Sequence, residues 1–139
     1  MWIDKFTIRN LELFNSGGGA KTSFTEVIDR TLTSMGGRLL KRWIAMPLVD
    51  VERISRRQDV VEILTKDADL AEALREQISA IGDLERMSSR IAAGRILPRE
   101  LVQLKNSLTA VETLKSLLES TDHERLHEIA AHIDPITAL

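Results

Sequence analysis

The most specific chemical motif in the chain is "HERLH", which runs from His123 to His127. Two histidines one helical turn apart can bind zinc, and a glutamate between them can activate water, as in zinc peptidases. A catalytic zinc also needs a third protein ligand, and one spacing used by these enzymes would place it at Ile133, one position after His132. We therefore expect a surface helix here, and we keep a zinc hydrolase, with His123 and His127 as weak metal candidates, as an alternative.

The stretch "NSGGGAKTS", residues 15–23, raises the question of a phosphate-binding loop. Such a loop needs two glycines at fixed positions before Lys and Ser or Thr, because several backbone N–H groups must turn toward one anion. Asn15 and Ala20 stand where those glycines would be. We therefore predict a glycine-rich connection over residues 16–22 without a cofactor site, followed by a helix that Ser23 and Glu26 cap together.

The composition is that of a soluble globular domain or a part of a larger protein, with 43% hydrophobic and 29% charged residues among 139. No apolar run approaches the roughly 20 residues that a membrane span requires, and the first residues lack the pattern of a secretory signal. The absence of cysteine excludes disulfides and thiolate zinc sites. These features favour a cytoplasmic protein with no membrane partner.

The net charge of −2 argues against a dedicated nucleic-acid-binding domain, but the charge is unevenly distributed. Residues 1–66 carry a net charge of +3 and residues 67–139 a net charge of −5. Most of the positive excess lies at six residues: Arg38, Lys41, Arg42, Arg53, Arg56 and Arg57. We interpret them as the solvated faces of two helices, and weak phosphate contact by the last five is the alternative.

Hydrophobic periodicity predicts an all-α fold, a multi-helix bundle of about seven helices with a short N-terminal β segment. Apolar and polar residues alternate most clearly from Phe6 to Leu13, so we place a strand within residues 1–15. Residues 23–139 change to helical spacing. The expected helices cover residues 24–33, 35–46, 50–64, 69–81, 83–94, 98–120 and 122–132.

Capping residues mark several of these helix starts. Asp50, Asp69 and Asp83 each precede an apolar stripe, and Pro98 suits a first helical turn because an N–H group has no partner there. Asp83 also begins the charged sequence "DLER", in which Arg86 is either solvated or part of a salt link to another domain. Apart from "HERLH", no grouping of residues suggests a catalytic site.

Five segments resemble, in wording and order, the core domain of the MutS family, the ATPases that recognise mismatched DNA. The segments are IDKFTIRNLELF, VIDRTLTSMGGRLLKRWIAMPL, ERISRRQDVVEIL, IGDLERMSSRIAAGRILPRELVQLKNSL and IDPI. Together they cover nearly the whole chain. The resemblance implies structural roles for eight residues of these segments: Arg9, Asn10, Asp29, Gly36, Arg38, Trp43, Asp83 and Arg86.

The resemblance implies that residues 1–139 are the N-terminal portion of the core domain, also called the lever, ahead of a clamp insertion. The partners would then be the connector, clamp and ATPase domains of the same protein. The parent would bind ATP, magnesium and mismatched duplex DNA and would form a homodimer. This chain would have no catalytic, cofactor or metal site of its own and would couple DNA binding to the ATPase.

Two residues receive packing roles from the resemblance. Gly36, at the start of a helix, would let another backbone approach closely. Trp43 would anchor a helix pair in the core, and its loss would then cost about 3–5 kcal/mol. The residue pattern also allows a function of another class, a free-standing helical adaptor that binds a partner protein.

Overall fold

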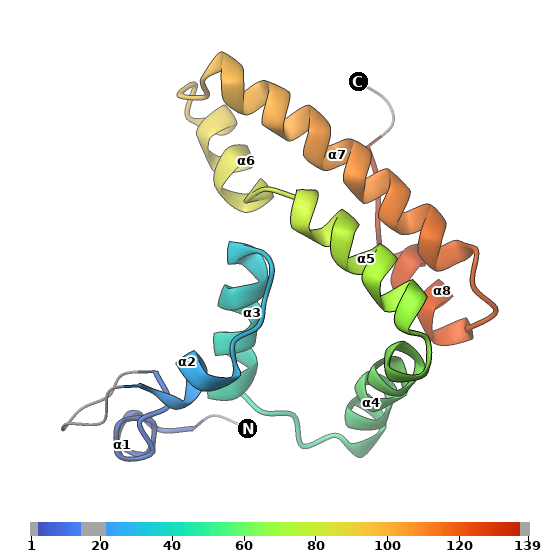
Figure 1. Cartoon of the computed structure of the whole chain (residues 1–139). Coiled ribbons are helices and arrows are strands. Elements are labelled where there is room, and N and C mark those ends of the chain that lie inside the picture. Colours follow the sequence, from blue (N-terminus) through green and yellow to red (C-terminus); the bar gives the residue numbers. More distant parts are fainter. Residues whose placement is uncertain (1–2, 15–21, 137–139) are drawn as a thin grey trace. The chain divides into compact units, whose positions relative to one another are not determined.

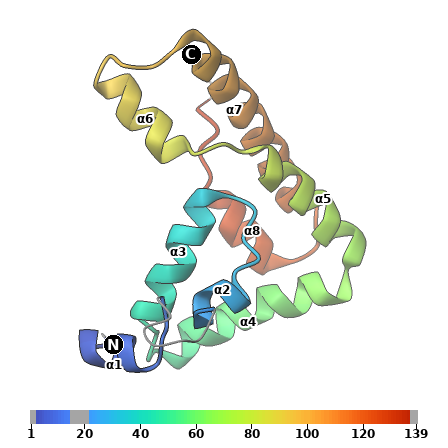
Figure 2. The ribbon, with the colours of Figure 1, turned by 60° about the vertical axis from the view of Figure 1, so that its left-hand side comes forward.

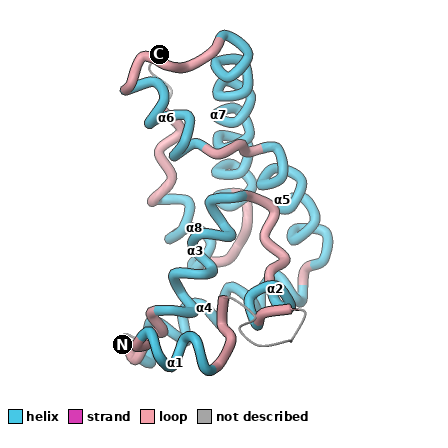
Figure 3. Tube along the Cα trace, turned by 90° about the vertical axis from the view of Figure 1, so that its left-hand side faces the viewer, coloured by secondary structure: helices cyan, strands magenta, loops and turns pink. Residues whose placement is uncertain are grey.

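A computed structural model describes residues 3–14 and 22–136. Every regular element in these residues is a helix, and they contain no strand (Figure 3), which confirms the all-α fold class. The eight helices are α1 (Lys5–Asn10), α2 (Phe24–Ile28), α3 (Ser34–Ala45), α4 (Val51–Lys66), α5 (Ala68–Ala80), α6 (Leu84–Ala92), α7 (Pro98–Glu119) and α8 (Glu124–Ala131) (Figure 1). The chain divides into two compact units, Met1–Ile54 and Ser55–Leu139, and the division falls within α4.

α1 stands where a strand was expected, and the prediction of a β segment within residues 1–15 is wrong for the described residues. The Asp4 carboxylate accepts the backbone N–H groups of Phe6 and Thr7 at 2.9 and 3.0 Å, and the Thr7 hydroxyl donates to it at 2.6 Å. The two backbone bonds satisfy N–H groups that have no partner within the helix at its first turn. α1 buries no residue, and within the alternating stretch from Phe6 to Leu13 only Leu13, after the helix, is buried.

The start of α2 is bonded to the segment that follows α1. The N–H groups of Phe24 and Thr25 donate to the carbonyls of Glu12 and Leu13, each at 3.0 Å. The Thr25 hydroxyl also donates to the Leu13 carbonyl, and both residues are buried. The first unit therefore brings two segments together through main-chain hydrogen bonds around a very small core.

Ser23 and Glu26 form the capping box that the sequence predicts for α2. The Ser23 N–H donates to Glu26 Oε2 at 2.6 Å, and the Glu26 N–H donates to Ser23 Oγ at 3.3 Å. α2 ends at Ile28 rather than near residue 33, because Asp29 adopts extended backbone (φ −68°, ψ 111°) and turns the chain. Of the glycine-rich connection predicted for residues 16–22, all but Thr22 lies outside the described residues.

Acidic side chains cap three of the later helices. The carboxylates of Asp50 and Asp83 accept a backbone N–H three residues further on, at 3.2 and 3.1 Å, which confirms both predicted caps. Pro98 is the first residue of α7, as predicted. The cap of α5 is Asp67, which accepts the Leu70 N–H at 2.9 Å, and not Asp69, because α5 begins one residue before Asp69 and a cap must lie outside the helix.

In the second unit, α7 is the central element. Its 22 residues give a length of about 33 Å, and it runs back alongside α6 and α5 while α8 packs against it (Figures 1 and 2). No helix among the described residues is both long and apolar enough to cross a membrane.

Side chains from α5, α7 and α8 form the core of the second unit. Its buried members are Leu74, Leu118, Leu126 and Ala130. Partly buried side chains surround them: Val60, Ile63, Leu64, Leu70, Leu114, Leu117 and Ile133. Because three of these come from α4, the second half of α4 belongs to the same packing unit.

A buried serine in the middle of α7 holds the break between α5 and α6. Ser107 is completely buried, and its hydroxyl donates to the Gln103 carbonyl and accepts the N–H of Gly82, both at 2.9 Å. A Cβ atom on Gly82 would lie 3.0 Å from Gln103 Nε2 and 3.1 Å from Met87 Cε. The chain therefore passes close to α7 at a position where only glycine fits without displacement.

An ion pair closes the hairpin formed by α6 and α7. Arg90 Nη1 lies 2.5 Å from Glu100 Oε1, and Arg90 Nη2 donates to the Arg95 carbonyl at 3.3 Å. The other carboxylate oxygen of Glu100 accepts the Leu97 N–H at 2.8 Å. Gly94 has a φ of +64°, a left-handed conformation that glycine adopts readily. These contacts make the turn between the two helices a well-defined structure.

Candidate functional site

The histidines of "HERLH" do not share one helical face. His123 is the residue before α8 and has extended backbone (φ −103°, ψ 110°), whereas His127 lies within the helix. His127 Nε2 lies 2.6 Å from the Thr121 carbonyl and His132 Nδ1 lies 2.7 Å from the Glu128 carbonyl, so each of these ring N–H groups donates a hydrogen bond to a carbonyl oxygen. Among the described residues, no group of three or more His, Cys, Asp or Glu side chains is arranged to hold a metal ion. The structure therefore adds no third ligand to the weak candidates His123 and His127.

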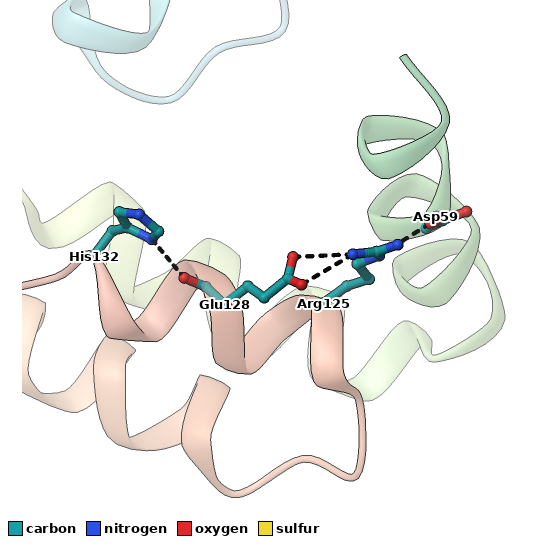
Figure 4. A network of polar contacts seen from close by, with 4 residues as sticks. All are labelled: Asp59, Arg125, Glu128 and His132. Atoms are coloured by element: carbon teal, nitrogen blue, oxygen red, sulfur yellow. Dashed lines mark hydrogen bonds and ion pairs between the residues drawn. The ribbon is translucent and has the colours of Figure 1, made fainter. Parts of the chain in front are cut away.

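The central arginine of the same motif forms a polar network with two carboxylates (Figure 4). Arg125 Nε lies 3.2 Å from Asp59 Oδ2, and Arg125 Nη1 lies 3.0 and 3.1 Å from the two oxygens of Glu128. The hydrogen bonds that Arg125 donates, chiefly to Glu128 and then to Asp59, raise the pKa of its guanidinium. Since Asp59 belongs to α4, the network links α4 to α8 in addition to the apolar core.

We expect Arg125→Gln to accelerate amide hydrogen exchange in α4. The substitution removes the cation shared by Asp59 and Glu128 and leaves the apolar contacts of α4 as its attachment to α8. Exchange followed by mass spectrometry would report local opening of this helix. The effect should shrink at high ionic strength because the pair is partly exposed.

Arg75→Gln is the matched control for this experiment. Arg75 pairs with Glu72 within α5 and joins no second helix. Equal exchange rates for α4 in both variants would show that the Arg125 network does not hold α4.

Asp29 and Thr31 form a tight turn between α2 and α3. Asp29 Oδ1 accepts the backbone N–H of Thr31 at 2.9 Å and its hydroxyl at 2.7 Å. The hydroxyl bond is the largest cause that lowers the pKa of the Asp29 carboxyl, followed by the backbone bond.

A Cβ on Gly36 would lie 3.2 Å from Thr33 Oγ1 and 3.3 Å from Thr31 Cβ. The close approach predicted at Gly36 therefore exists, but threonine side chains make it and not another backbone.

Thr31→Val should raise the pKa of Asp29 toward its ordinary value. A group with a lowered pKa in the folded state stabilises the protein above the ordinary aspartate pKa of about 3.9, and this contribution is lost as the pH falls through the lowered value. The variant should therefore lose less stability on acidification. A titration of the Asp29 carboxyl by NMR measures the shift directly.

Thr65→Val provides the comparison for the Asp29 titration. The Thr65 hydroxyl donates to the Val61 carbonyl at 2.7 Å and makes no bond to an acidic side chain. It should leave the pKa of Asp29 unchanged. If Thr31→Val also left it unchanged, the hydroxyl could not be the cause of the lowered value.

Asp83 and Arg86 lie at the start of α6. The carboxylate of Asp83 caps the helix through the Arg86 N–H. Both residues line an open hollow of about 310 Å³ between α6 and α7, together with Met87, Arg90, Glu100 and Gln103. The Arg86 side chain is exposed and forms no ion pair with another described residue.

Comparison with known protein families matches residues 6–138 to MutS domain III. This chain belongs to the MutS domain III family. The resemblance noted in the sequence is thereby confirmed over nearly the whole chain.

The relatives of this MutS domain III chain are named as DNA mismatch repair proteins. The chain is 45% identical to the DNA mismatch repair protein MutS of Christiangramia forsetii over 133 residues, which is 96% of the chain and 15% of that protein. It is 44% identical to MutS of Cytophaga hutchinsonii over 97% of the chain, and 46% identical to MutS of Phocaeicola vulgatus over 95%. The chain spans about 15% of the length of these relatives.

The residues that the resemblance marked lie on several helices of this MutS domain III. Arg9 and Asn10 end α1, where both are exposed. Arg38 and Trp43 lie on α3. Trp43 is 42% exposed, and α3 buries no residue among those the structure describes, so its role as a core anchor stays a prediction.

The six basic residues of the first half are divided between two helices of the MutS domain III. Arg38, Lys41 and Arg42 lie on α3, and Arg53, Arg56 and Arg57 lie on α4. All but Arg57 are exposed. Lys41 also lines an open hollow with Asp29 and Glu26, and its charge contributes to lowering the pKa of Asp29. Contact of these residues with phosphate stays a prediction.

Several interactions of this MutS domain III were not predicted from its sequence, and three of them join separate helices or connections: Asp59 with Arg125, Arg90 with Glu100, and Gly82 with Ser107. The second had a usable signal, since opposite charges flank a short turn that contains Gly94 and ends at Pro98. The other two join residues 66 and 25 positions apart, and no local pattern relates them.

Proposed function

We propose that the chain is the N-terminal portion of the helical core, or lever, of a DNA mismatch repair ATPase. In this role it couples the binding of mismatched DNA to the ATPase domain and carries out no chemistry itself. The observation that supports this most strongly is the match of residues 6–138 to MutS domain III, together with about 45% identity to mismatch repair proteins named MutS.

The helices of the second unit suit the transmission of movement. α7 offers a continuous beam of about 33 Å, and α5 and α8 pack on it through buried Leu74, Leu118 and Leu126. A packed helix pair moves as a body because its core does not deform continuously. The Arg125 network adds α4 to this body.

The proposal assigns ATP, magnesium and mismatched duplex DNA to the parent protein, which would act as a homodimer. The connector, clamp and ATPase domains would be the chain's partners within one polypeptide. We expect the 139-residue chain alone neither to hydrolyse ATP nor to prefer mismatched over perfectly paired DNA.

A chimera tests the proposal. Residues 6–138 would replace the matching segment of MutS from Christiangramia forsetii, with which the chain shares 45% identity. We expect basal ATP hydrolysis to persist and mismatched DNA still to change its rate. A chimera that folds and hydrolyses ATP but no longer responds to a mismatch would contradict the lever role.

A further inference from the structure

The α6–α7 hairpin carries a net positive charge, although the unit to which it belongs is acidic. Residues 84–105, here called the hairpin end, carry a net charge of +3. The segments on either side, residues 67–83 and 106–136, each carry a net charge of −4. The overall negative charge of the second half therefore conceals a local surface of the opposite sign.

Most cations of the hairpin end have no partner within it. Arg90 is bound to Glu100, whose side chain is only 17% exposed. The other four basic residues are exposed and form no ion pair with any residue that the structure describes: Arg86, Arg95, Arg99 and Lys105. Four positive charges thus face solvent close to a single ion pair that fixes the fold of the turn.

Large apolar side chains are exposed over the same stretch. The exposed fractions are 44% for Ile91, 43% for Leu97, 49% for Leu101 and 60% for Val102. Leu101 and Lys105 also line an open groove of about 360 Å³ along α7, with Leu104, Leu108, Pro135 and Ile136, and with Thr109 and Glu112 at its far end along the helix. The surface therefore combines a mainly apolar groove with cations that have no carboxylate partner among the described residues.

We propose that the hairpin end is a docking surface for an acidic protein segment that carries apolar side chains. Arginine beside exposed apolar side chains is typical of the energetically important centre of protein interfaces. Glutamate or aspartate of the partner would pair with Arg95 and Arg99, and its apolar residues would cover Leu101 and Val102. The proposal does not depend on the coupling role, because it concerns a surface and not a movement.

The same features disfavour nucleic acid as the occupant. Contacts with nucleic acid are predominantly polar and basic, so they would leave four large apolar side chains uncovered. A duplex that extends along α7 beyond the hairpin end would also meet a segment with a net charge of −4, which would repel its phosphates. A short acidic segment avoids both costs.

The hairpin end is already ordered before a partner binds. The pair between Arg90 and Glu100, the bond from Leu97 to Glu100 and the left-handed Gly94 fix the turn. Binding therefore would not have to order this backbone, which lowers the entropy cost of association.

The test uses the 139-residue chain and a fluorescent helical peptide of about 16 residues, with leucines on one face and glutamates on the other. Fluorescence anisotropy measures its dissociation constant. R95E/R99E should weaken binding about tenfold, and replacing the glutamates of the peptide by glutamine should do the same. L101Q/V102Q should weaken it several-fold while keeping α7 helical.

K66E/R75E is the matched control, because it makes the same change in charge on α4 and α5, where both residues form exposed pairs within one helix. It should leave binding within about twofold of the unaltered chain. Circular dichroism would confirm that each variant is folded.

Three results would overturn the proposal. The first is equal affinity of R95E/R99E and the unaltered chain. The second is an equal loss in K66E/R75E, which would show attraction by total charge alone. The third is a duplex DNA of similar length that binds more tightly than the peptide and loses affinity in R95E/R99E, which would identify a nucleic-acid surface instead.

Discussion

Leu126→Ala is expected to lower the free energy of unfolding of the chain by about 3–4 kcal/mol, within the range seen for buried leucines. Only 1% of the Leu126 side chain is exposed, and it lies among Leu74, Leu118 and Ala130. The substitution removes apolar contacts of three helices at once and leaves a cavity that their packing cannot close fully. Urea unfolding followed by circular dichroism measures the change.

Leu101→Ala is the matched comparison for this prediction. It makes the same chemical change on α7 at a side chain that is 49% exposed. We expect its cost to be below about 1 kcal/mol, since little apolar surface returns to water. Similar costs for the two variants would mean that the core around Leu126 is not the main stabilising cluster.

Ser107→Ala is expected to cost about 1–2 kcal/mol, although alanine is the better helix former. The Ser107 hydroxyl accepts the N–H of Gly82 at 2.9 Å, and Ser107 itself is completely buried. Without that oxygen, the Gly82 N–H has no acceptor, and an unsatisfied buried donor is costly. Thermal and urea unfolding both report the loss.

Ser116→Ala is the control that distinguishes the bond from the Gly82 N–H to Ser107 from the bond that a serine hydroxyl donates within its own helix. Ser116 also lies on α7 and donates to the carbonyl four residues earlier, at 3.1 Å, but it is exposed and accepts no bond from another segment. We expect this variant to be neutral or slightly stabilising. An equal loss in both variants would assign the effect to the helix and not to the Gly82 contact.

Periodicity and capping residues were sufficient to predict most of the helices. The seven expected helices correspond to α2–α8, and Ser23, Asp50 and Asp83 cap where the sequence predicts. The β segment failed because a single aspartate, Asp4, stabilises a helix start more directly than alternation over a few residues stabilises an unpaired strand. Hydrogen bonds between near neighbours therefore determined the structure of residues 5–10.

The core was harder to predict than the helices. Val60, Ile63 and Leu64 of α4 pack on the core, but Val61, in the same apolar stretch of the sequence, is 64% exposed. Periodicity finds a broad apolar face, whereas the exact boundary of burial depends on which neighbours pack on it. On α3, the apolar side chains of Leu39 and Trp43 are 46% and 42% exposed, so an apolar stripe in the sequence did not by itself predict a buried face.

For the candidate site residues, too, local interactions could be predicted from the sequence and interactions between helices could not. Asp29 and Asp83 act through bonds to residues two or three positions away, which a sequence can suggest. The link between Asp59 and Arg125 depends on how α4 and α8 pack, and spacing along the chain contains no information about it. The exposed cations of the hairpin end were visible as residues, but their lack of carboxylate partners required the structure.

The two long-range ion pairs also differ in when they can form during folding. Arg90 and Glu100 are 10 residues apart, whereas Asp59 and Arg125 are 66 apart. Closing the longer loop costs about 1.7 kcal/mol more in chain entropy, so the α6–α7 hairpin should nucleate first. Pulse-labelled hydrogen exchange should then show that the hairpin amides become protected before those of α4. During synthesis on the ribosome, the hairpin is complete before Arg125 has been made. The Asp59 carboxylate of α4 can therefore form its ion pair only after α8 has been synthesised.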